Sequence, residues 1–302
     1  MTNGANAGIL ESLSTGLADA VERIAPAVVL VDGRPRQSAT GVVYAHDLVI
    51  TADHVLEREE DLSIQTHDGR TLAAQFVGRD PATDLAVLRV PGLNIDPAKA
   101  ATSEARVGQL ALAVGRPSND GIQASLGIVT SVGGPVKMGR GQTLERFFRT
   151  DATPYPGFSG GPFVDTQGAM LGIITTGLAR GVTLALPASV VVRVAQTLTQ
   201  HGKVKRGFLG ISSQPVTIPQ AQRAGRTQES GLLVVKVEDG APAQHGGLLI
   251  GDILVGLDNQ TVEDPDDLQG LLSGDRVGRS VPVTILRGGG LQTLQITIGE
   301  RN

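Results

Sequence analysis

Short β-branched runs separated by turn residues limit the fold of this sequence more than any other feature. Ten such runs follow one another: Val28–Val31, Gly41–Tyr44, Leu48–Thr51, Leu62–Thr66, Leu85–Val90, Leu110–Val114, Gly127–Val132, Phe147–Thr150, Met170–Thr176 and Thr183–Leu186. This spacing is typical of an all-β sandwich or barrel and not of alternating βα units. Glycine is abundant, at 40 of 302 residues, and aromatic residues make up only 3%. Many turns and an aliphatic core are therefore expected.

Helical patterns flank this β-rich region. In the N-terminal segment 1–26, apolar residues recur at helical spacing and Pro26 ends the pattern. Pro187 opens a second helical stretch with Val190, Val191, Val194 and Leu198 on one face, and Gly202 is its expected C-terminal stop. The β-rich domain with this helix is predicted to span 27–201.

The C-terminal third reads as a second, mixed α+β domain. A short polar and basic linker at 202–206 precedes it, and the domain is predicted to span 207–302. Strands are expected at Leu209–Ile211, Leu232–Val237, Ile253–Leu257, Val281–Arg287 and Leu291–Ile298. Helices are expected near Pro242 and over Pro265–Leu272, the latter capped by Asp264, and Gly288–Gly290 indicates a hairpin.

Composition excludes several classes of function. The formal net charge of −4 provides no basic footprint for nucleic acid. The chain has no cysteine, which excludes disulfides and thiolate nucleophiles, and no H-E-x-x-H spacing, so neither a metal site nor a cofactor is expected. No apolar run approaches the roughly 18 residues needed to cross a bilayer.

The first residues, Met1–Gly8, carry no Lys or Arg ahead of an apolar region, so they do not match a signal peptide. A cytoplasmic location is expected for the chain as it stands. The alternative is a periplasmic or other extracytoplasmic location, if an export segment is missing.

One loop, Tyr155–Pro162, places Ser159 among three glycines with prolines on both sides. A serine hydroxyl becomes a nucleophile when a base takes its proton and N–H groups receive the oxyanion, and a glycine-rich turn supplies such groups. The alternative is an ordinary surface loop. Gly157–Gly161 also fits the G-x-S-x-G pattern of α/β-hydrolases, but that motif needs a helix directly after the serine, and Gly-Gly-Pro starts helices poorly.

Two upstream residues complete a better arrangement. His54 follows the apolar run that ends at Thr51, and Asp84 directly precedes the run Leu85–Val90. In chymotrypsin-type enzymes the triad comes from loops and strand ends in the order His, Asp, Ser. Taken singly, each residue is more often structural, but the three contexts together indicate nucleophilic catalysis.

The blocks Thr51–Val55, Asp80–Leu88 and Gly157–Pro162 resemble the three catalytic blocks of the HtrA/Deg serine proteases, and the second domain resembles the PDZ domain that follows the protease in that family. The resemblance implies a chymotrypsin-like double β-barrel with His54 as base, Asp84 as its orienter and Ser159 as nucleophile. It also implies an oxyanion hole from the N–H groups of Gly157 and Ser159, with Phe158 as a further candidate.

Three departures from the family pattern stand out. Phe158 replaces the usual Asn before the nucleophile, so the loop is held differently or is inactive until a ligand arrives. Asp53 precedes His54 where a small or amide residue is usual, and a nearby carboxylate favours a protonated imidazole if the two side chains approach. The loop around Gly33–Ser38 is short, whereas relatives that build large cages have a long one.

Two binding sites are predicted. Thr153, which lies six residues before the serine, is expected to form the substrate pocket with Ile173, Ile174 and Thr175. This pocket is expected to favour a small or medium aliphatic residue; the alternative is that these residues pack the barrel.

The second predicted site lies in the PDZ domain. Successive N–H groups around a glycine form an anion-binding concavity, so a C-terminal peptide is expected there. Its predicted contacts are Phe208, Leu209, Gly210, Ile211, Leu268, Leu271 and Leu272, where the leucines face peptide or core, and Arg206 is a candidate carboxylate partner.

The expected function is an HtrA-type serine endopeptidase that degrades unfolded or misfolded proteins through an acyl-enzyme. The alternative is a proteolytically weak or latent chaperone and peptide-binding scaffold. The resemblance also implies a homotrimer built through the protease domains and the N-terminal segment.

Overall fold

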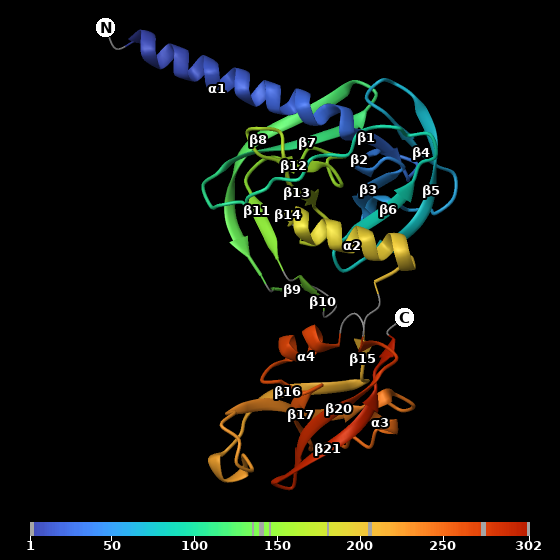
Figure 1. The fold of residues 1–302 in the computed structure, drawn as a ribbon, viewed down its shortest axis with the longest axis vertical. Helices are drawn as coiled ribbons and strands as arrows, with labels where there is room; N and C mark the ends of the chain where they lie inside the picture. The colour runs from blue at the N-terminus through green and yellow to red at the C-terminus, as the bar shows by residue number, and fades with distance from the viewer. Residues whose placement is uncertain are drawn as a thin grey trace. The chain divides into compact units, whose positions relative to one another are not determined.

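The computed structural model describes residues 3–134, 136–138, 142–144, 146–179, 181–204, 207–272 and 276–300. The chain forms two compact units, Met1–Val204 and Lys205–Asn302 (Figure 1). Within the part of the chain described, no helix is long and apolar enough to cross a membrane.

The first unit contains two closed six-stranded barrels, as the resemblance implies. The first barrel has the order β1-β2-β3-β6-β5-β4 and consists of β1 (Val28–Asp32), β2 (Ala39–Ala45), β3 (Leu48–Ala52), β4 (Leu62–Gln65), β5 (Thr71–Asp80) and β6 (Leu85–Arg89). The second has the order β11-β14-β13-β12-β7-β8 and consists of β7 (Leu110–Ser118), β8 (Gly121–Gly133), β11 (Phe147–Thr150), β12 (Pro162–Val164), β13 (Met170–Thr175) and β14 (Thr183–Pro187). The strands β9 (Val136–Met138) and β10 (Gln142–Leu144) pair with each other.

Several first-barrel strands are buried on both faces, which explains their continuous apolar sequences. Successive side chains of a strand point to opposite faces. Val43 and Val49 accordingly lie inside the first barrel, whereas Val42 and Ile50 face the cluster that contains α2 (Ala188–His201). Val190, Val191, Val194 and Leu198 of α2 belong to that same cluster.

The helix α2 lies directly against β5. Gly202, with φ 73°, caps the helix through an N–H bond to the Leu198 carbonyl, as the sequence predicts. A Cβ on Gly78 would lie 2.0 Å from the Gly202 carbonyl oxygen, so only glycine fits at this point of β5. This close approach joins the end of α2 to the first barrel.

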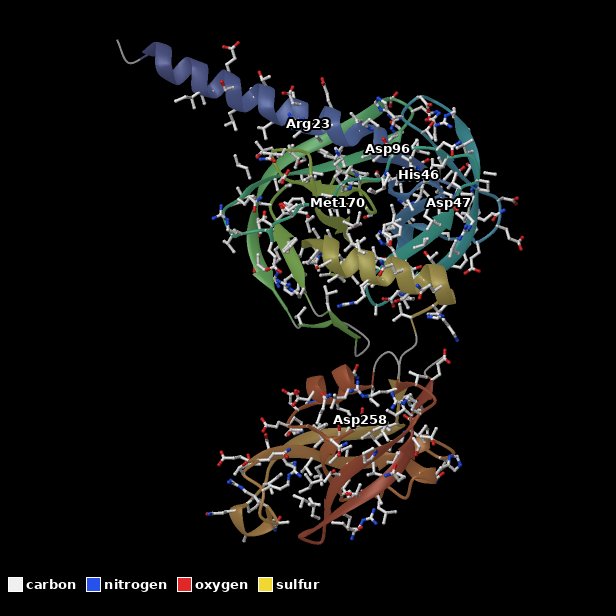
Figure 2. The ribbon with its side chains drawn as sticks, in the orientation of Figure 1. Arg23, His46, Asp47, Asp96, Met170 and Asp258 are labelled. Carbon is white, nitrogen blue, oxygen red and sulfur yellow. The ribbon has the colours of Figure 1, made fainter. Side chains whose placement is uncertain are left out.

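The helix α1 (Asn3–Ile24) packs on the second barrel through its C-terminal turns. Ala20 and Ile24 are buried with Leu112 and Val164. Arg23, at the end of α1 that meets the barrels in Figure 2, donates to the Gln167 carbonyl at 2.9 Å. A short 3-10 turn, Ala25–Ala27, then leads into β1.

The second unit has an α+β fold, as the resemblance to a PDZ domain implies. Its sheet has the order β16-β17-β18-β20-β21 and consists of β16 (Ile211–Thr217), β17 (Ser230–Val237), β18 (Ile253–Leu257), β20 (Ser280–Arg287) and β21 (Gly290–Thr297), with β19 (Gln260–Thr261) paired to β18. The strands β15 (Gly207–Phe208) and β22 (Gly299–Glu300) form a separate pair. The helices are α3 (Pro242–His245) and α4 (Pro265–Leu271), and the Asp264 carboxylate accepts the Asp267 N–H at 2.9 Å, which caps α4.

Several strands differ from the sequence prediction, which did not include the short strands β9, β10, β15, β19 and β22. β5 and β12 were not predicted; β5 carries polar residues along much of its length, and β12 has only three residues. The first long strand of the second unit begins at Ile211 and extends to Thr217, so the prediction of a strand over Leu209–Ile211 was wrong in extent. Exposed polar side chains in β16 conceal its strand pattern.

Candidate active site

The ends of two paired strands bring His54 and Asp84 together. His54 lies in a short 3-10 turn directly after β3, and Asp84 directly precedes β6. Ala52 of β3 pairs with Leu85 of β6, so Asp84, directly before Leu85, and His54, two residues after Ala52, lie at the same end of this strand pair. The His54 ring Nδ1 lies 2.7 Å from Asp84 Oδ2, and the His54 backbone N–H donates to Asp84 Oδ1 at 2.9 Å.

Asp84 is held tightly and is only 4% exposed. Its backbone has the left-handed φ of 54°, and its carbonyl accepts the Asp53 N–H at 3.0 Å. The Thr175 hydroxyl donates to Oδ2 from β13 of the second barrel. Because Nδ1–H of His54 donates to this carboxylate, the other ring nitrogen, Nε2, is left as the acceptor.

Three consecutive residues connect the pair to Ser159. Thr175 contacts Asp84, and the Thr176 hydroxyl lies 3.0 Å from Ser159 Oγ. A Cβ on Gly177 would lie 2.5 Å from His54 Nδ1 and 2.7 Å from Asp84 Oδ2, so the main chain passes directly over that hydrogen bond. Among the described residues no hydrogen bond joins Ser159 Oγ to the His54 ring; Thr176 is its partner. Such bonds are often long before substrate binds.

The loop Tyr155–Pro162, called the Ser159 loop below, leaves two N–H groups open. The Phe158 N–H donates to the Tyr155 carbonyl at 3.0 Å. The N–H groups of Gly157 and Ser159 donate to no acceptor in the part of the chain described. Gly157 has φ 88°, and a Cβ there would lie 2.6 Å from Pro117 Cβ, so this position requires glycine on both counts.

Phe158 anchors the Ser159 loop by apolar packing. Its side chain is 0% exposed and belongs to the core of the second barrel. The ring fills the space beside Gly115, where a Cβ would lie 2.6 Å from it, and it contacts Tyr155 edge to face at 5.4 Å between centroids. A buried ring, and not the hydrogen bond of an amide, therefore holds this loop. The sequence predicts either such a different anchor or a loop that is inactive until a ligand arrives.

Thr40 of β2 ties the Ser159 loop to the first barrel. Its hydroxyl accepts the Arg116 N–H at 2.9 Å and donates to the Gly157 carbonyl at 2.7 Å. Its own N–H donates to the Ser159 carbonyl at 3.3 Å. Thr40 is 0% exposed, and one residue thus fixes the carbonyls on both sides of Phe158.

Asp53 pairs with Arg79 of β5. Its carboxylate lies 3.2 Å from the guanidinium, although no well-aligned hydrogen bond joins them. Burial raises the pKa of Asp53 above its usual range, and the positive charge of Arg79 opposes that shift only in part. The extra carboxylate next to His54 is therefore directed to a cation.

The residues predicted for the substrate pocket have different locations. Ile173 and Ile174 are fully buried, and their side chains pack in two separate core clusters. Thr175 is 1% exposed and holds Asp84. Thr153 is exposed, and its N–H donates to Ser125 Oγ at 2.8 Å. The four do not form one common pocket.

The residues predicted for the PDZ peptide site also divide into two groups. Leu209, Leu268, Leu271 and Leu272 are buried in the core of the second unit. Phe208 and Ile211 are half-buried, and Gly210 has the left-handed φ of 78°. The N–H groups of Leu209 and Gly210 donate to no described residue. Arg206 lies outside the described residues.

Sequence reasoning missed Thr40, Thr176 and Gly177. Thr40 has no local signal, because its role depends on the docking of two barrels. Thr175 ends the buried strand β13 and Thr176 and Gly177 directly follow it, and residues at strand ends are the usual source of triad contacts in this fold. Within the described residues, no group of three His, Cys, Asp or Glu side chains gathers in a way that could hold a metal ion.

The geometry defines the class of a trypsin-like serine peptidase, with the site between two barrels. A trypsin-like peptidase domain model matches residues 39–173, and a PDZ domain model matches 207–298. The solved structure of the HtrA-type protease AlgW with decapeptide has a TM-score of 0.80 and 30% identity, over 95% of this chain and 99% of that one. The solved structure of the serine endoprotease from Yersinia pestis has a TM-score of 0.77 and 30% identity, over 95% of this chain and 98% of that one.

The curated relatives include probable periplasmic serine endoproteases described as DegP-like. That of Pseudomonas putida strain F1 is 33% identical over 264 residues, which are 85% of this chain and 55% of that protein. That of Rhizobium meliloti strain 1021 is 34% identical over 278 residues, which are 88% of this chain and 54% of that protein. The chain thus spans about half the length of these relatives. It belongs to the HtrA family of trypsin-like serine endoproteases with a C-terminal PDZ domain.

Replacing Thr40 tests the connection between the barrels. Thr40→Val leaves the Arg116 N–H and the Gly157 carbonyl without partners, at about 1–3 kcal/mol for each buried group. Thr40→Ser keeps both bonds and loses one methyl, at about 1 kcal/mol. The chain has two tyrosines, Tyr44 and Tyr155, and no tryptophan, so tyrosine fluorescence during urea unfolding reports on the first unit alone. Equal losses in both variants would contradict this role of the hydroxyl.

Replacing Phe158 tests the apolar anchor. Phe158→Asn, which installs the usual family residue, should destabilise the first unit by about 3–5 kcal/mol, because it removes a buried ring and places an amide in an apolar cluster. Phe158→Leu should lose clearly less. Calorimetry of the two variants measures the difference, and an Asn variant as stable as the parent would disprove the anchor.

Proposed function

We propose that this chain is a serine endopeptidase that degrades unfolded or misfolded proteins and is fed or regulated by peptides bound at the PDZ domain. The observation that carries the proposal is the His54–Asp84 hydrogen bond, with Ser159 beside it through Thr175, Thr176 and Gly177. Family membership supports the same assignment.

In the proposed reaction Ser159 Oγ attacks the scissile carbonyl while Nε2 of His54 takes its proton. Asp84 keeps the ring in the required tautomer and stabilises the imidazolium that forms. The open N–H groups of Gly157 and Ser159 receive the oxyanion. Because the Phe158 N–H is bonded within its own loop, we leave it out of the oxyanion hole. His54 then returns the proton to the leaving amine, and water releases the acyl group.

The proposed PDZ ligand is a peptide with a free C-terminal carboxylate. The unbonded N–H groups of Leu209 and Gly210, around a glycine with φ 78°, form a concavity suited to an anion. Within the described residues, the adjoining strand β16 pairs with one other strand, β17. An extended peptide can therefore add to its open edge.

A second candidate function is a latent enzyme or peptide-binding scaffold. The bond of Ser159 Oγ to Thr176, in place of one to His54, favours this alternative. In this alternative, hydrolysis requires Ser159 Oγ to leave Thr176 and turn to His54, and a bound peptide would induce that rearrangement.

A fluorophosphonate probe and casein cleavage separate the two functions. The parent chain should be labelled, and Ser159→Ala should lose labelling and lose casein cleavage by about 10⁴-fold or more. Ser103→Ala, at an exposed serine, is the matched control and should behave like the parent. Retained activity in Ser159→Ala would exclude this nucleophile. Absence of labelling in the parent, with and without a C-terminal peptide, would favour the scaffold.

We also propose a homotrimer in which copies of the chain bury the outer half of α1. Ile9, Leu10 and Leu13 are 66%, 67% and 43% exposed on this apolar helix, whereas its last turns are buried on the barrel. Light scattering should give three times the chain mass for the parent and a smaller mass for the double variant Leu10→Ser, Leu13→Ser. Val107→Ser, at a residue 64% exposed in a loop, should leave the mass unchanged. A monomeric parent would overturn the proposal.

A further inference from the structure

A polar hollow of about 530 Å³ opens beside the Ser159 loop. Its walls include residues 36–38, which precede β2, residues 117–119, where β7 turns toward β8, and the side chains of Ser63 and Gln65 on β4. Ser63 and Gln65 are the two half-buried residues of β4 and alternate with its buried ones, so they face outward from the first barrel. Both barrels therefore contribute to the lining.

Two lining residues lie directly against Gly157. A Cβ on Gly157 would lie 2.6 Å from Pro117 Cβ and 2.9 Å from the Ser38 carbonyl oxygen. Gly157 supplies one of the two open N–H groups of the proposed oxyanion hole. Because an extended chain advances about 3.3 Å per residue, the hollow is within reach of the first few residues of a peptide whose scissile carbonyl lies at Gly157.

The hollow is expected on the leaving-group side of the scissile bond. The Ser159 loop has different neighbours at its two ends: Thr176 contacts Ser159, whereas Ser38 and Pro117 contact Gly157. Trypsin-like peptidases hold the residue before the scissile bond in their main pocket, which the sequence places at the end of β13. A peptide whose acyl half lies along Thr176 therefore continues with its leaving-group half along Ser38 and Pro117.

Arg36 gives the hollow a positive charge that the protein leaves unpaired. Its side chain is exposed and lines the hollow. Among the described residues no carboxylate and no other side chain bonds to it. Arg34, two residues earlier, donates from Nε to the Gln37 carbonyl at 2.6 Å, which holds this short segment in place.

Arg116 adds a buried positive charge next to the hollow. It directly precedes Pro117, is 5% exposed, and donates to the Thr66 carbonyl at 3.1 Å and to His67 Nδ1 at 2.9 Å. In the part of the chain described, no carboxylate pairs with its guanidinium, and its Nε has no partner. Burying a charge without a counter-charge is costly. An anion in the hollow would lower that cost.

The carboxylates at the hollow already have partners. Asp32, in its wall, accepts from the Arg58 guanidinium at 3.0 Å. Asp120, beside the wall, accepts the Ser118 hydroxyl at 2.9 Å. The charge of Arg36 thus remains available to a ligand.

We propose that this hollow is a subsite for the leaving-group half of the substrate, where Arg36 selects an acidic side chain at the second to fourth residue after the scissile bond. The inference rests on the proposed endopeptidase function. It adds a preference on the side of the bond opposite the main pocket.

Paired substrates test this preference on the full chain. A casein peptide that the parent cleaves at one bond is made as a quenched fluorescent substrate in two forms, with either Glu or Gln at the second to fourth residues after that bond. Glu and Gln have nearly the same size and differ in charge. For the parent, kcat/KM should be about 3–10-fold higher for the Glu form, the effect of one or two exposed ion pairs. High salt should shrink this ratio.

Variants of Arg36 should change the ratio of the two rates in a charge-dependent way. Arg36→Gln should remove most of the preference, Arg36→Lys should keep it, and Arg36→Glu should reverse it. Because each variant is judged by a ratio, a general loss of activity cancels. Arg106→Gln, at an exposed arginine outside the hollow, is the matched control and should keep the ratio of the parent.

The outcomes separate this inference from the proposed function. Equal rates for the two forms in the parent, or a Glu preference that survives Arg36→Gln, would overturn the subsite while endopeptidase activity stands. A Glu preference found only at residues before the scissile bond would overturn its assignment to the leaving-group side. If Ser159→Ala cleaves the substrates as the parent does, the proposed function fails and the subsite fails with it.

Discussion

The site depends on the docking of two barrels, because each barrel holds groups that belong to the other. Thr40, from the first barrel, fixes the carbonyls of Gly157 and Ser159 in the second. Thr175, from the second barrel, holds the carboxylate of Asp84 in the first. The first barrel pairs His54 with Asp84 by itself, and the second barrel completes the contacts of that carboxylate. The geometry of the candidate site thus depends on contacts between the two barrels, such as those of Thr40 and Thr175.

The fold was largely predictable from the sequence, because the barrel strands are β-branched and doubly buried. The strands that escaped prediction are those whose sequence lacks this signal, such as β5 with its polar residues and the three-residue β12. His54, Asp84 and Ser159 were recognisable because each lies at a strand end or in a glycine-rich turn. Thr40 was not, since a buried threonine in a strand looks the same whether its hydroxyl serves a distant loop or only its own barrel.

Phe158 illustrates how a side chain and its backbone can have separate tasks. The ring is part of the core of the second barrel, while the neighbouring N–H groups of Gly157 and Ser159 remain open. A polar anchor would require a partner inside the barrel, whereas the ring requires only the absence of a side chain at Gly115. Two residues predicted for the substrate pocket show a related separation of side chain and backbone. Ile173 and Ile174 lie beside the site in sequence, but their side chains point into the cores.

Gly177 has a consequence for the movement of protons. Its main chain passes so close to the His54–Asp84 bond that a Cβ at this position would clash with both side chains, and Asp84 itself is almost fully buried. Because Nδ1 is bonded to Asp84, Nε2 is the ring nitrogen left open for a further proton. In the proposed reaction this gives the proton one route, between Nε2 of His54 and Ser159.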